Sequence, residues 1–578
     1  MKRIFHYIKP YKWAFIFGPL LMITEVIGEI LLPKLMANII NIGVAGHDTG
    51  YVIVMGVLMV VTALIMMVGG TGGAWFAAKG SVSMAADLRR DAFARVQAFS
   101  FANIDSFSTG SLVTRLTNDV TQVQNLVNMC MRMMLRAPGM LIGALIMSIA
   151  MNPSLSVILA VVIPVLVLTL FFVIRMAFPR FTAMQKKIDG VNSAIQENLT
   201  NVRVIKSFVR GDFEEEKFGK ANSELMENSL RAFRVIITTM PIMMLAMNLT
   251  TLAVVWFGGQ QVLAGGMAIG DLTAFITYVT QILMSLMMLS MVIMQSSRAT
   301  ASLRRINEVL DAKVDLTDEN ASQKDLKVKN GKVEFRNVSF RYYKNSEEKV
   351  LSGVSFTAQP GEVVGIIGST GSGKTTLVQM IPRLYDVDEG QVLVDGVDVR
   401  DYSLKNLRDG VGMVLQKNVL FSGTIRENLM WGNEKATEEE IRSAAQSAQA
   451  LDFVESFSDG MDTMLDQGGT NVSGGQKQRL CIARALLKKP KILILDDSTS
   501  AVDTATERRI RESFSKELQD STKLIIAQRI TSVMDADRII VLDEGGIVGM
   551  GTHDELMKTS EEYREIYDSQ MDREAKAQ

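Results

Sequence analysis

The stretch Gly368-Ser369-Thr370-Gly371-Ser372-Gly373-Lys374-Thr375-Thr376 decides how the rest of this 578-residue sequence is read. An apolar run, residues 363–367, precedes it, and residues 377–380 continue the pattern of a helix. In a strand–loop–helix context the loop N–H groups turn toward phosphate oxygens, and the Lys374 ammonium reaches the β- and γ-phosphates. The Thr375 hydroxyl is a ligand for Mg²⁺ in such loops. The stretch therefore predicts a site for ATP with Mg²⁺.

The composition indicates an apolar part joined to an ordinary soluble part. Hydrophobic residues make up 48% of the chain although 21% of it is charged. The net charge of −1 gives no electrostatic reason to expect nucleic acid as a partner. The two cysteines, Cys130 and Cys481, lie one in each part, which argues against a disulfide framework.

Six apolar stretches occupy the first 300 residues, near 13–32, 51–77, 137–151, 155–173, 235–257 and 272–294. Most are close to the ~20 residues that a bilayer-spanning helix needs, and the third is expected to begin earlier, near Met131. A secretory signal at residues 1–33 is the alternative for the first stretch, but its apolar run is too long and five more follow. We expect a polytopic helical membrane domain over residues 1–306, a linker over 307–331 and a soluble domain over 332–578.

Basic residues indicate how the spans are oriented. Lys and Arg gather before the first span, between spans two and three, and between spans four and five, whereas residues 41–50, 152–154 and 258–271 contain none. The positive-inside rule then places both termini in the cytosol of a plasma-membrane protein. The two long inner connections have helical periodicity and turn at polar segments, residues 107–120 and 198–206. They are either ordinary amphipathic helices or elements that transmit motion.

Charged residues inside the spans allow two interpretations. Glu25 and Glu29 share one face of the first span, and Arg132 and Arg136 enter the third. Because a charge at mid-bilayer costs ~2.5–3.5 kcal/mol, these groups should face a partner or a cavity. A structural ion pair is the first interpretation, and an acidic patch in a transport cavity that accepts cations is the second. The methionines of the inner spans suit an adaptable binding surface but also ordinary packing.

Beyond residue 331 the pattern becomes α/β. We expect strands at 332–340, 362–367, 411–415, 491–495, 524–527 and 538–542, with helices between several of them. The strand at 491–495 ends in two carboxylates, Asp496 and Asp497. In P-loop proteins the first of these anchors the Mg²⁺ shell.

The segment Asn471-Val472-Ser473-Gly474-Gly475-Gln476-Lys477-Gln478-Arg479 is similar to the L-S-G-G-Q signature of ATP-binding cassette (ABC) proteins, with Val472 in place of the opening Leu. With the phosphate loop and six spans, the chain resembles an ABC exporter half-transporter over nearly its whole length. The resemblance implies a head-to-tail dimer in which each ATP lies between one P-loop and the opposite signature, here Ser473, Gly474, Gly475 and Gln476.

The resemblance also implies roles for single residues. Tyr342 is expected to stack on adenine, and Gln416 to sense Mg²⁺ and to couple to the membrane domain. Asp503, in the segment Ser500-Ala501-Val502-Asp503, is expected to cross the dimer interface. The polar turns at residues 109–120 and 198–206 match the coupling regions of the family, which favours the motion-transmitting interpretation.

Two positions depart from the family pattern. Hydrolytic sites of the family carry Glu after the Mg²⁺ aspartate and His after the strand expected at 524–527, whereas this chain has Asp497 and Gln528. Asp withdraws the carboxylate by ~1.5 Å, and Gln cannot carry a positive charge. The chain has only three His, and none is placed to substitute. A degenerate ATP site is therefore predicted, similar to that of one subunit in bacterial heterodimeric multidrug exporters.

These observations predict one half of an ATP-driven efflux pump for small amphipathic compounds. The partner would be a second half-transporter that carries the catalytic Glu and the switch His. A lipid or lipopeptide flippase is an alternative, and a substrate-stimulated ATPase assay would separate the two. An ATP-gated channel or regulator is a further alternative, which predicts ion conductance on ATP binding. A soluble ABC ATPase that acts on nucleic acid is excluded by the six spans.

Overall fold

The computed structural model describes residues 2–343, 347–498 and 502–577. Contacts divide the chain into two compact units. The first contains Met1–Gln97 and Thr109–Asp311, and the second contains Ala98–Ser108 and Ala312–Gln578. The first unit is helical and the second is α/β, so each is described separately.

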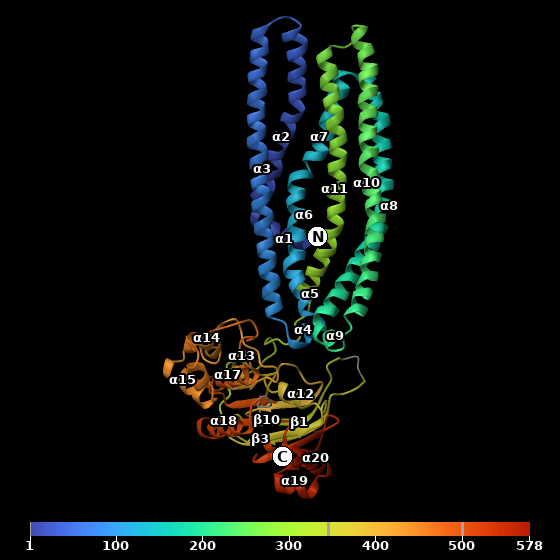
Figure 1. Ribbon diagram of the computed structural model, residues 1–578. Helices are drawn as coiled ribbons and strands as arrows, with labels where there is room; N and C mark the ends of the chain where they lie inside the picture. The colour runs from blue at the N-terminus through green and yellow to red at the C-terminus, as the bar shows by residue number, and fades with distance from the viewer. Residues whose placement is uncertain (1, 344–346, 499–501, 578) are drawn as a thin grey trace. The chain divides into compact units, whose positions relative to one another are not determined.

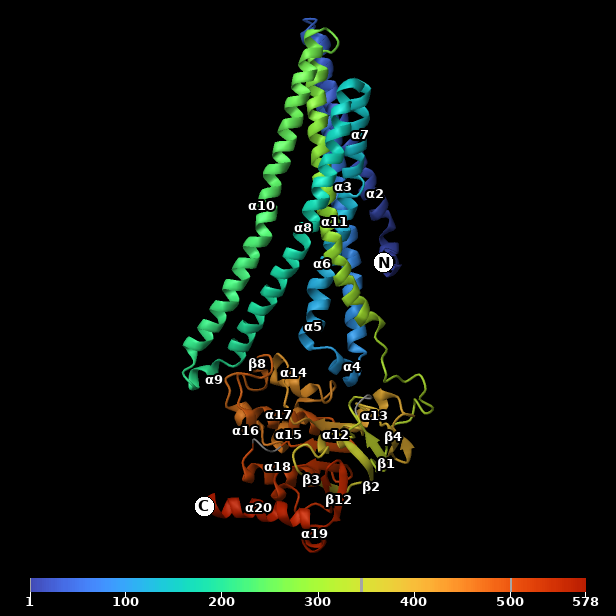
Figure 2. The ribbon, with the colours of Figure 1, turned by 90° about the vertical axis from the view of Figure 1, so that its right-hand side faces the viewer.

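Long helices form the first unit, and Figures 1 and 2 show several of them running alongside one another. They are α1 (Lys2–Ile8), α2 (Lys12–Asn38), α3 (Thr49–Gln97), α5 (Thr109–Thr114), α6 (Val120–Met133), α7 (Arg136–Met151), α8 (Pro153–Thr200), α9 (Val202–Ser207), α10 (Gly211–Leu263) and α11 (Ile269–Asp311), with short 3₁₀ or π segments at Lys9–Tyr11, Ile39–Val44 and Arg115–Asp119.

Six helical segments of the described chain are long and apolar enough to cross a bilayer. They are Arg3–Val44, Thr49–Gln97, Thr109–Met151, Pro153–Thr200, Pro241–Leu263 and Ile269–Leu289. Each overlaps one of the predicted spans, so the expectation of six transmembrane helices is confirmed.

The spanning helices extend well past their apolar parts. Helix α3 has 49 residues, which is about 74 Å at 1.5 Å per residue and more than twice the ~30 Å hydrocarbon core. Helix α11 continues to Asp311, so residues 307–311, where the linker is expected to begin, are helical. The charged residues after 306 continue the same helix beyond its apolar part.

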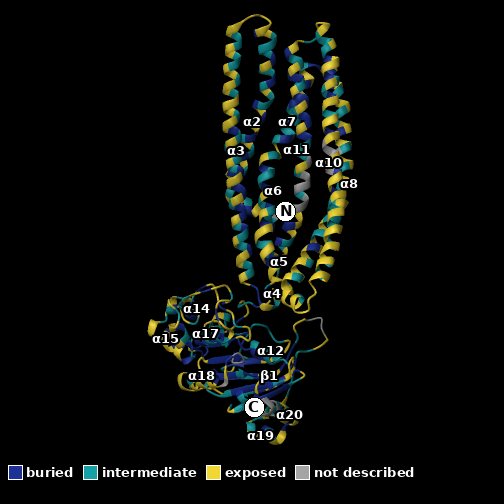
Figure 3. Cartoon of the chain, in the orientation of Figure 1, coloured by how far each residue is buried: buried dark blue, intermediate teal, exposed yellow. Residues whose placement is uncertain are grey.

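The core of the first unit lies where α11 packs against α2, α7 and α8. Phe275, Tyr278 and Ile282 of α11 are fully buried there, and Figure 3 shows dark buried residues along these facing surfaces. The methionines of the inner spans lie in two different environments. Met243 is buried in this core, whereas Met244 is exposed.

Two sheets form the frame of the second unit. A six-stranded sheet has the order β12-β11-β3-β10-β9-β6, and a four-stranded antiparallel sheet has the order β2-β1-β4-β5. Their strands are β1 (Val333–Phe340), β2 (Leu351–Ala358), β3 (Val363–Gly368), β4 (Glu389–Val394), β5 (Val397–Asp398), β6 (Val411–Val414), β9 (Ile492–Asp496), β10 (Thr522–Ile526), β11 (Arg538–Asp543) and β12 (Gly546–Gly551). Strands β7 (Gly423–Thr424) and β8 (Met464–Leu465) form a separate two-stranded sheet. All six predicted strands are present, within two residues at each end.

The second unit also contains helices. They are α12 (Lys374–Gln379), α13 (Leu404–Gly410), α14 (Ile425–Met430), α15 (Glu438–Ser447), α16 (Leu451–Glu455), α17 (Gly474–Leu487), α18 (Thr504–Glu517), α19 (His553–Thr559) and α20 (Glu561–Ala577). Helix α4 (Phe101–Ser106) also belongs to this unit. The Tyr385 hydroxyl donates to Asp105 Oδ2 of α4 over 2.9 Å, and the Phe101 and Tyr385 rings are 6.0 Å apart.

Strand β3 belongs to a run of five parallel strands in the order β11-β3-β10-β9-β6. It pairs in parallel with β10 on one side and with β11 on the other, and β9 follows β10. Their carboxyl ends therefore meet at one edge of the sheet, which is where ligands bind in open α/β sheets. The phosphate loop leaves β3 at this edge.

Candidate nucleotide site

Glycines give the phosphate loop its shape. Gly371 and Gly373 have φ angles of 89° and 92°, in the left-handed region that side chains rarely adopt. A Cβ at Gly373 would also lie 2.8 Å from the Val350 carbonyl oxygen. The loop therefore turns tightly and delivers Lys374 to the first position of α12.

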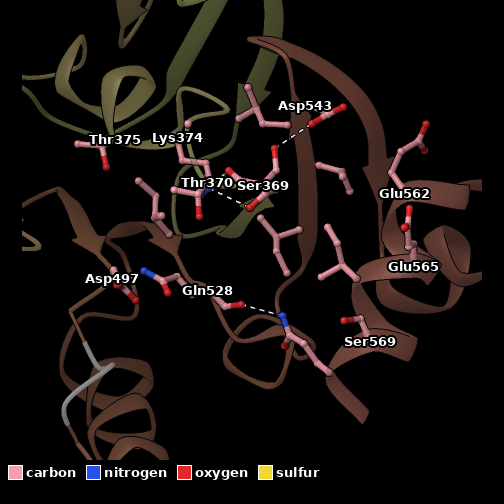
Figure 4. Close-up of a pocket in the computed structure, with 18 of the residues that line it drawn as sticks. Ser369, Thr370, Lys374, Thr375, Asp497, Gln528, Asp543, Glu562, Glu565 and Ser569 are labelled. Atoms are coloured by element: carbon pink, nitrogen blue, oxygen red, sulfur yellow. Dashed lines mark hydrogen bonds between the residues drawn. The ribbon is translucent and has the colours of Figure 1, made fainter. Parts of the chain in front are cut away.

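A cavity of about 590 Å³ opens beside this loop (Figure 4). It is lined by Ile367, Gly368, Ser369, Thr370, Gly371, Lys374, Thr375, Gln416, Asp496, Asp497, Ile526, Gln528, Val541, Leu542, Asp543, Glu562, Glu565, Ile566, Ser569 and Gln570. The structure thus brings the phosphate loop, both carboxylates and both amide side chains of the predicted site into one cavity, whereas Ser372, Gly373 and Thr376 lie behind it in the loop and in α12.

Thr375 and Asp496 are arranged as a pair that fits Mg²⁺. The Thr375 hydroxyl donates to Asp496 Oδ1 over 3.0 Å, and Asp496 is 2% exposed. Burial raises the pKa of the Asp496 carboxyl, so a bound cation would favour its ionised form. Mg²⁺ commonly uses one or two carboxylates together with substrate phosphates. Among the described residues, no group of three or more His, Cys, Asp or Glu is placed to hold a metal ion by itself.

The Lys374 ammonium bends back onto its own loop. Its Nζ donates to the carbonyl oxygens of Gly368 and Ser369 over 2.9 and 2.6 Å, and burial lowers its pKa. Triphosphate oxygens are stronger acceptors than these carbonyls because they are charged. The side chain is therefore held at the site by contacts that a nucleotide can replace.

The two departures from the family pattern are bonded to each other. Gln528 Nε2 donates to Asp497 Oδ2 over 2.7 Å, and Gln416 also hydrogen-bonds to this carboxylate. Burial raises the pKa of Asp497. Asp497 has a φ of 46°, a left-handed conformation that Asp tolerates better than longer side chains. Figure 4 shows the two labelled side chains next to each other.

Helix α20 fixes the segment that carries Gln528. Gln570 Nε2 donates to the Gln528 carbonyl oxygen over 2.8 Å, and Gln570 Oε1 accepts from the Ile530 N–H over 2.8 Å. One amide thus bonds to residues on both sides of this turn. No local sequence pattern reveals Gln570, because it contacts Gln528 across 42 positions of the chain.

Tyr342 lies near the site but outside the residues that line the cavity. Its hydroxyl is 2.8 Å from Thr376 Oγ1, and its ring makes edge contacts with Phe340 and Tyr385. The side chain is 39% exposed, so part of the ring remains open for contact. Its stacking on adenine stays a prediction.

The signature residues are separate from the phosphate-loop cavity of their own chain. Ser473 caps α17, where its hydroxyl accepts from the Gln476 N–H and the Gln476 side chain returns a bond to the Ser473 N–H. Neither these residues nor the two glycines between them line the cavity. Asp503 caps α18 and is exposed, while Ser500 and Ala501 lie outside the described residues. The roles of these residues in a partner's site remain predictions.

In the membrane unit, Glu25 and Glu29 both pair with the guanidinium group of Arg136. Arg136 of α7 lies 3.2 Å from Glu25 Oε1 and 2.7 Å from Glu29 Oε1. Gln281 of α11 donates to the Glu29 carbonyl oxygen over 2.9 Å. The geometry supports the structural ion pair, which joins α2 and α7, while the Gln281 bond links α11 to α2. Contact of these carboxylates with substrate stays a prediction.

Fold and site together define a P-loop ATPase fused to a six-span membrane unit, and comparison with known proteins agrees. Residues 15–286 match the ABC transporter transmembrane region, and residues 351–500 match the ABC transporter family. The chain is 43% identical to the uncharacterised ABC transporter ATP-binding protein YfiB of Bacillus subtilis, over 99% of each. It is 32% identical to the putative multidrug export ATP-binding/permease protein YgaD of the same species, over 98% of each.

Two further similarities bear on function and fold. The ATP-dependent lipid A-core flippase of Desulfotalea psychrophila is 32% identical, over 84% of this chain and 85% of the flippase. A bacterial Atm1-family ABC exporter solved with ATP bound superposes with a TM-score of 0.81 at 24% identity, over 97% and 98% of the two chains. This chain belongs to the ABC transporters, as a half-transporter with the exporter fold in the plasma membrane. Its family hydrolyses ATP to drive transport, and its half-transporters generally work as dimers.

Proposed function

We propose that this chain is one subunit of a heterodimeric ATP-driven exporter whose own phosphate-loop site binds ATP and hydrolyses it slowly or not at all. The observation that carries the proposal is the 2.7 Å bond from Gln528 Nε2 to Asp497 Oδ2. The two positions that should orient water and the γ-phosphate satisfy each other instead.

The chemistry of this pair disfavours hydrolysis. Asp497 is shorter than Glu by one C–C bond, ~1.5 Å, and a misplacement near 1 Å can cost ~100-fold in rate. Gln528 offers a neutral N–H donor where a protonated His would also supply charge. The parts that bind nucleotide, including Lys374, Thr375 and Asp496, are intact, which supports binding without efficient turnover.

The intact signature supports hydrolysis at the partner's site. Ser473 and Gln476 form a regular helix cap whose N–H groups are suited to phosphate contact. A partner that carries Glu and His would form the working site with this signature. The heterodimer thus contains one ATP that is held and one that is cleaved.

The transported compounds are taken to be small and amphipathic. The name of the B. subtilis relative YgaD supports multidrug export. Partly buried methionines at the membrane core, such as Met247 and Met287, are adaptable contacts for varied apolar ligands. Lipid transport is a second candidate, which the name of the lipid A-core flippase supports.

An asymmetry experiment tests the assignment. In the purified complex, Ser473→Ala should remove most ATPase activity because it damages the partner's site, whereas Asp497→Asn should leave the rate nearly unchanged. In a homodimer with two working sites, both substitutions would abolish activity, and that result would refute the proposal. ATPase stimulation measured with a drug panel and with phospholipids then separates the two substrate classes.

A further inference from the structure

A hollow between α8 and α10 lies at the level where both helices change from apolar to polar. Along α8 the continuous apolar run ends at Ile174, Arg175 follows it, and Arg180 comes after a short second apolar stretch that ends at Phe178. Along α10, which runs in the opposite direction, Arg231 and Arg234 come just before the apolar run that starts at Val235. This border marks the headgroup layer of the cytosolic leaflet, because the loops on that side carry the excess of Lys and Arg.

The hollow has about 420 Å³ and is strongly basic. Its lining consists of Pro179, Arg180 and Ala183 from α8 and Asn228, Arg231 and Arg234 from α10. No carboxylate belongs to this lining. Glu227 pairs with Arg231 at 3.3 Å, but both side chains are more than 60% exposed, so that pair contributes little. Figure 3 shows the adjoining surfaces of α8 and α10 as largely exposed.

Three guanidinium groups around one hollow suit an oxyanion. Like charges repel each other there, and an anion of sufficient size would relieve that repulsion. Arg binds phosphate oxygens in a bidentate manner through its planar fork, and the Asn228 amide adds a neutral donor. The apolar helix surface on the membrane side of the hollow would accept acyl chains.

We propose that this arginine pocket, formed by Arg180, Arg231 and Arg234, binds the phosphate headgroup of an anionic phospholipid from the cytosolic leaflet. Each basic side chain near an anionic headgroup strengthens binding about fivefold, so three together give about 100-fold. The site is independent of the nucleotide chemistry and of the identity of the exported compound.

Native mass spectrometry of the detergent-purified full-length protein, titrated with phosphatidylglycerol or phosphatidylcholine, tests the pocket. The variant Arg180→Gln/Arg231→Gln/Arg234→Gln should lose affinity for phosphatidylglycerol about 100-fold, with phosphatidylcholine unaffected. The matched control Lys186→Gln/Arg203→Gln/Arg210→Gln removes the same charge from exposed positions outside the pocket and should retain the affinity. Equal losses in both variants would overturn the site in favour of general surface charge.

Two further arms keep the result decisive. Soluble glycerol phosphate at the same concentration should not displace phosphatidylglycerol. Displacement would instead assign the pocket to a soluble phosphate compound and overturn the lipid proposal. If the triple variant lacks a thermal transition, the single substitutions replace it, and each should weaken phosphatidylglycerol binding about fivefold. Unchanged binding in all three would also overturn the proposal.

Discussion

Restoring the family residues at the degenerate site should restore hydrolysis. The double substitution Asp497→Glu/Gln528→His breaks the 2.7 Å bond between these side chains and advances the carboxylate by ~1.5 Å toward the bound phosphates. Because ~1 Å of misplacement costs ~100-fold, the turnover of this site should rise about 100-fold. The left-handed φ of 46° at position 497 offsets part of the gain, since a longer side chain costs roughly 1 kcal/mol more there.

The assay must isolate this site from its partner. Phosphate release is measured in a complex whose partner has its own catalytic Glu replaced by Gln, at saturating Mg²⁺-ATP. Lys374→Ala added to the double variant should remove the gain, because it removes the cation at the β- and γ-phosphates. Gln570→Ala added to the double variant should lower the maximal rate without changing ATP affinity, since it releases the turn that carries position 528.

Two results would refute the reasoning. The first is an unchanged rate in the double variant although ATP still binds. The second is an unmodified chain that already turns over as fast as its partner. Either would mean that the bond between Asp497 and Gln528 does not limit hydrolysis.

Three further outcomes are expected. Tyr342→Ala should weaken ATP binding by about 5- to 150-fold, the range of one lost base–aromatic stack, whereas Tyr342→Phe should retain it in a fluorescent-nucleotide titration. Thr375→Ala should weaken binding of Mg²⁺-ATP about tenfold but leave Mg²⁺-free ATP unaffected, as titrations with and without EDTA would show. Arg136→Gln should destabilise the membrane unit by about 3 kcal/mol because it leaves two carboxylates unpaired, and adding Glu29→Gln should recover part of the lost melting temperature.

The sequence predicts those parts of the molecule whose signals are local. Apolar length alone predicts the six spans, because the bilayer imposes it on each helix separately. The glycine pattern at 368–373 predicts a tight loop after a strand, and the loop has the φ angles that glycine allows. Asp497, just after β9, and Gln528, shortly after β10, meet at the nucleotide cavity, because parallel strands end at one edge of the sheet.

Features that depend on distant contacts could not be predicted. Strand β12 (Gly546–Gly551) contains three glycines and forms a strand because it pairs with β11, which overrides its weak propensity. Helix α4 lies just before the turn expected at 109–120, and its Asp105 accepts a hydrogen bond from the distant Tyr385. No local pattern predicts that contact. Only the fold shows that Arg136 pairs with both Glu25 and Glu29, because Arg136 belongs to α7 and the two carboxylates belong to α2.

The clamp made by Gln570 has a consequence for biosynthesis. The turn after β10 receives two hydrogen bonds from the side chain of Gln570, a residue of α20. Because the ribosome synthesises a chain from its N-terminus, position 528 is made 42 positions before the residue that clamps it. The membrane helices and most of the sheet are also made before Gln570, so the nascent nucleotide site gains this clamp only after those elements exist.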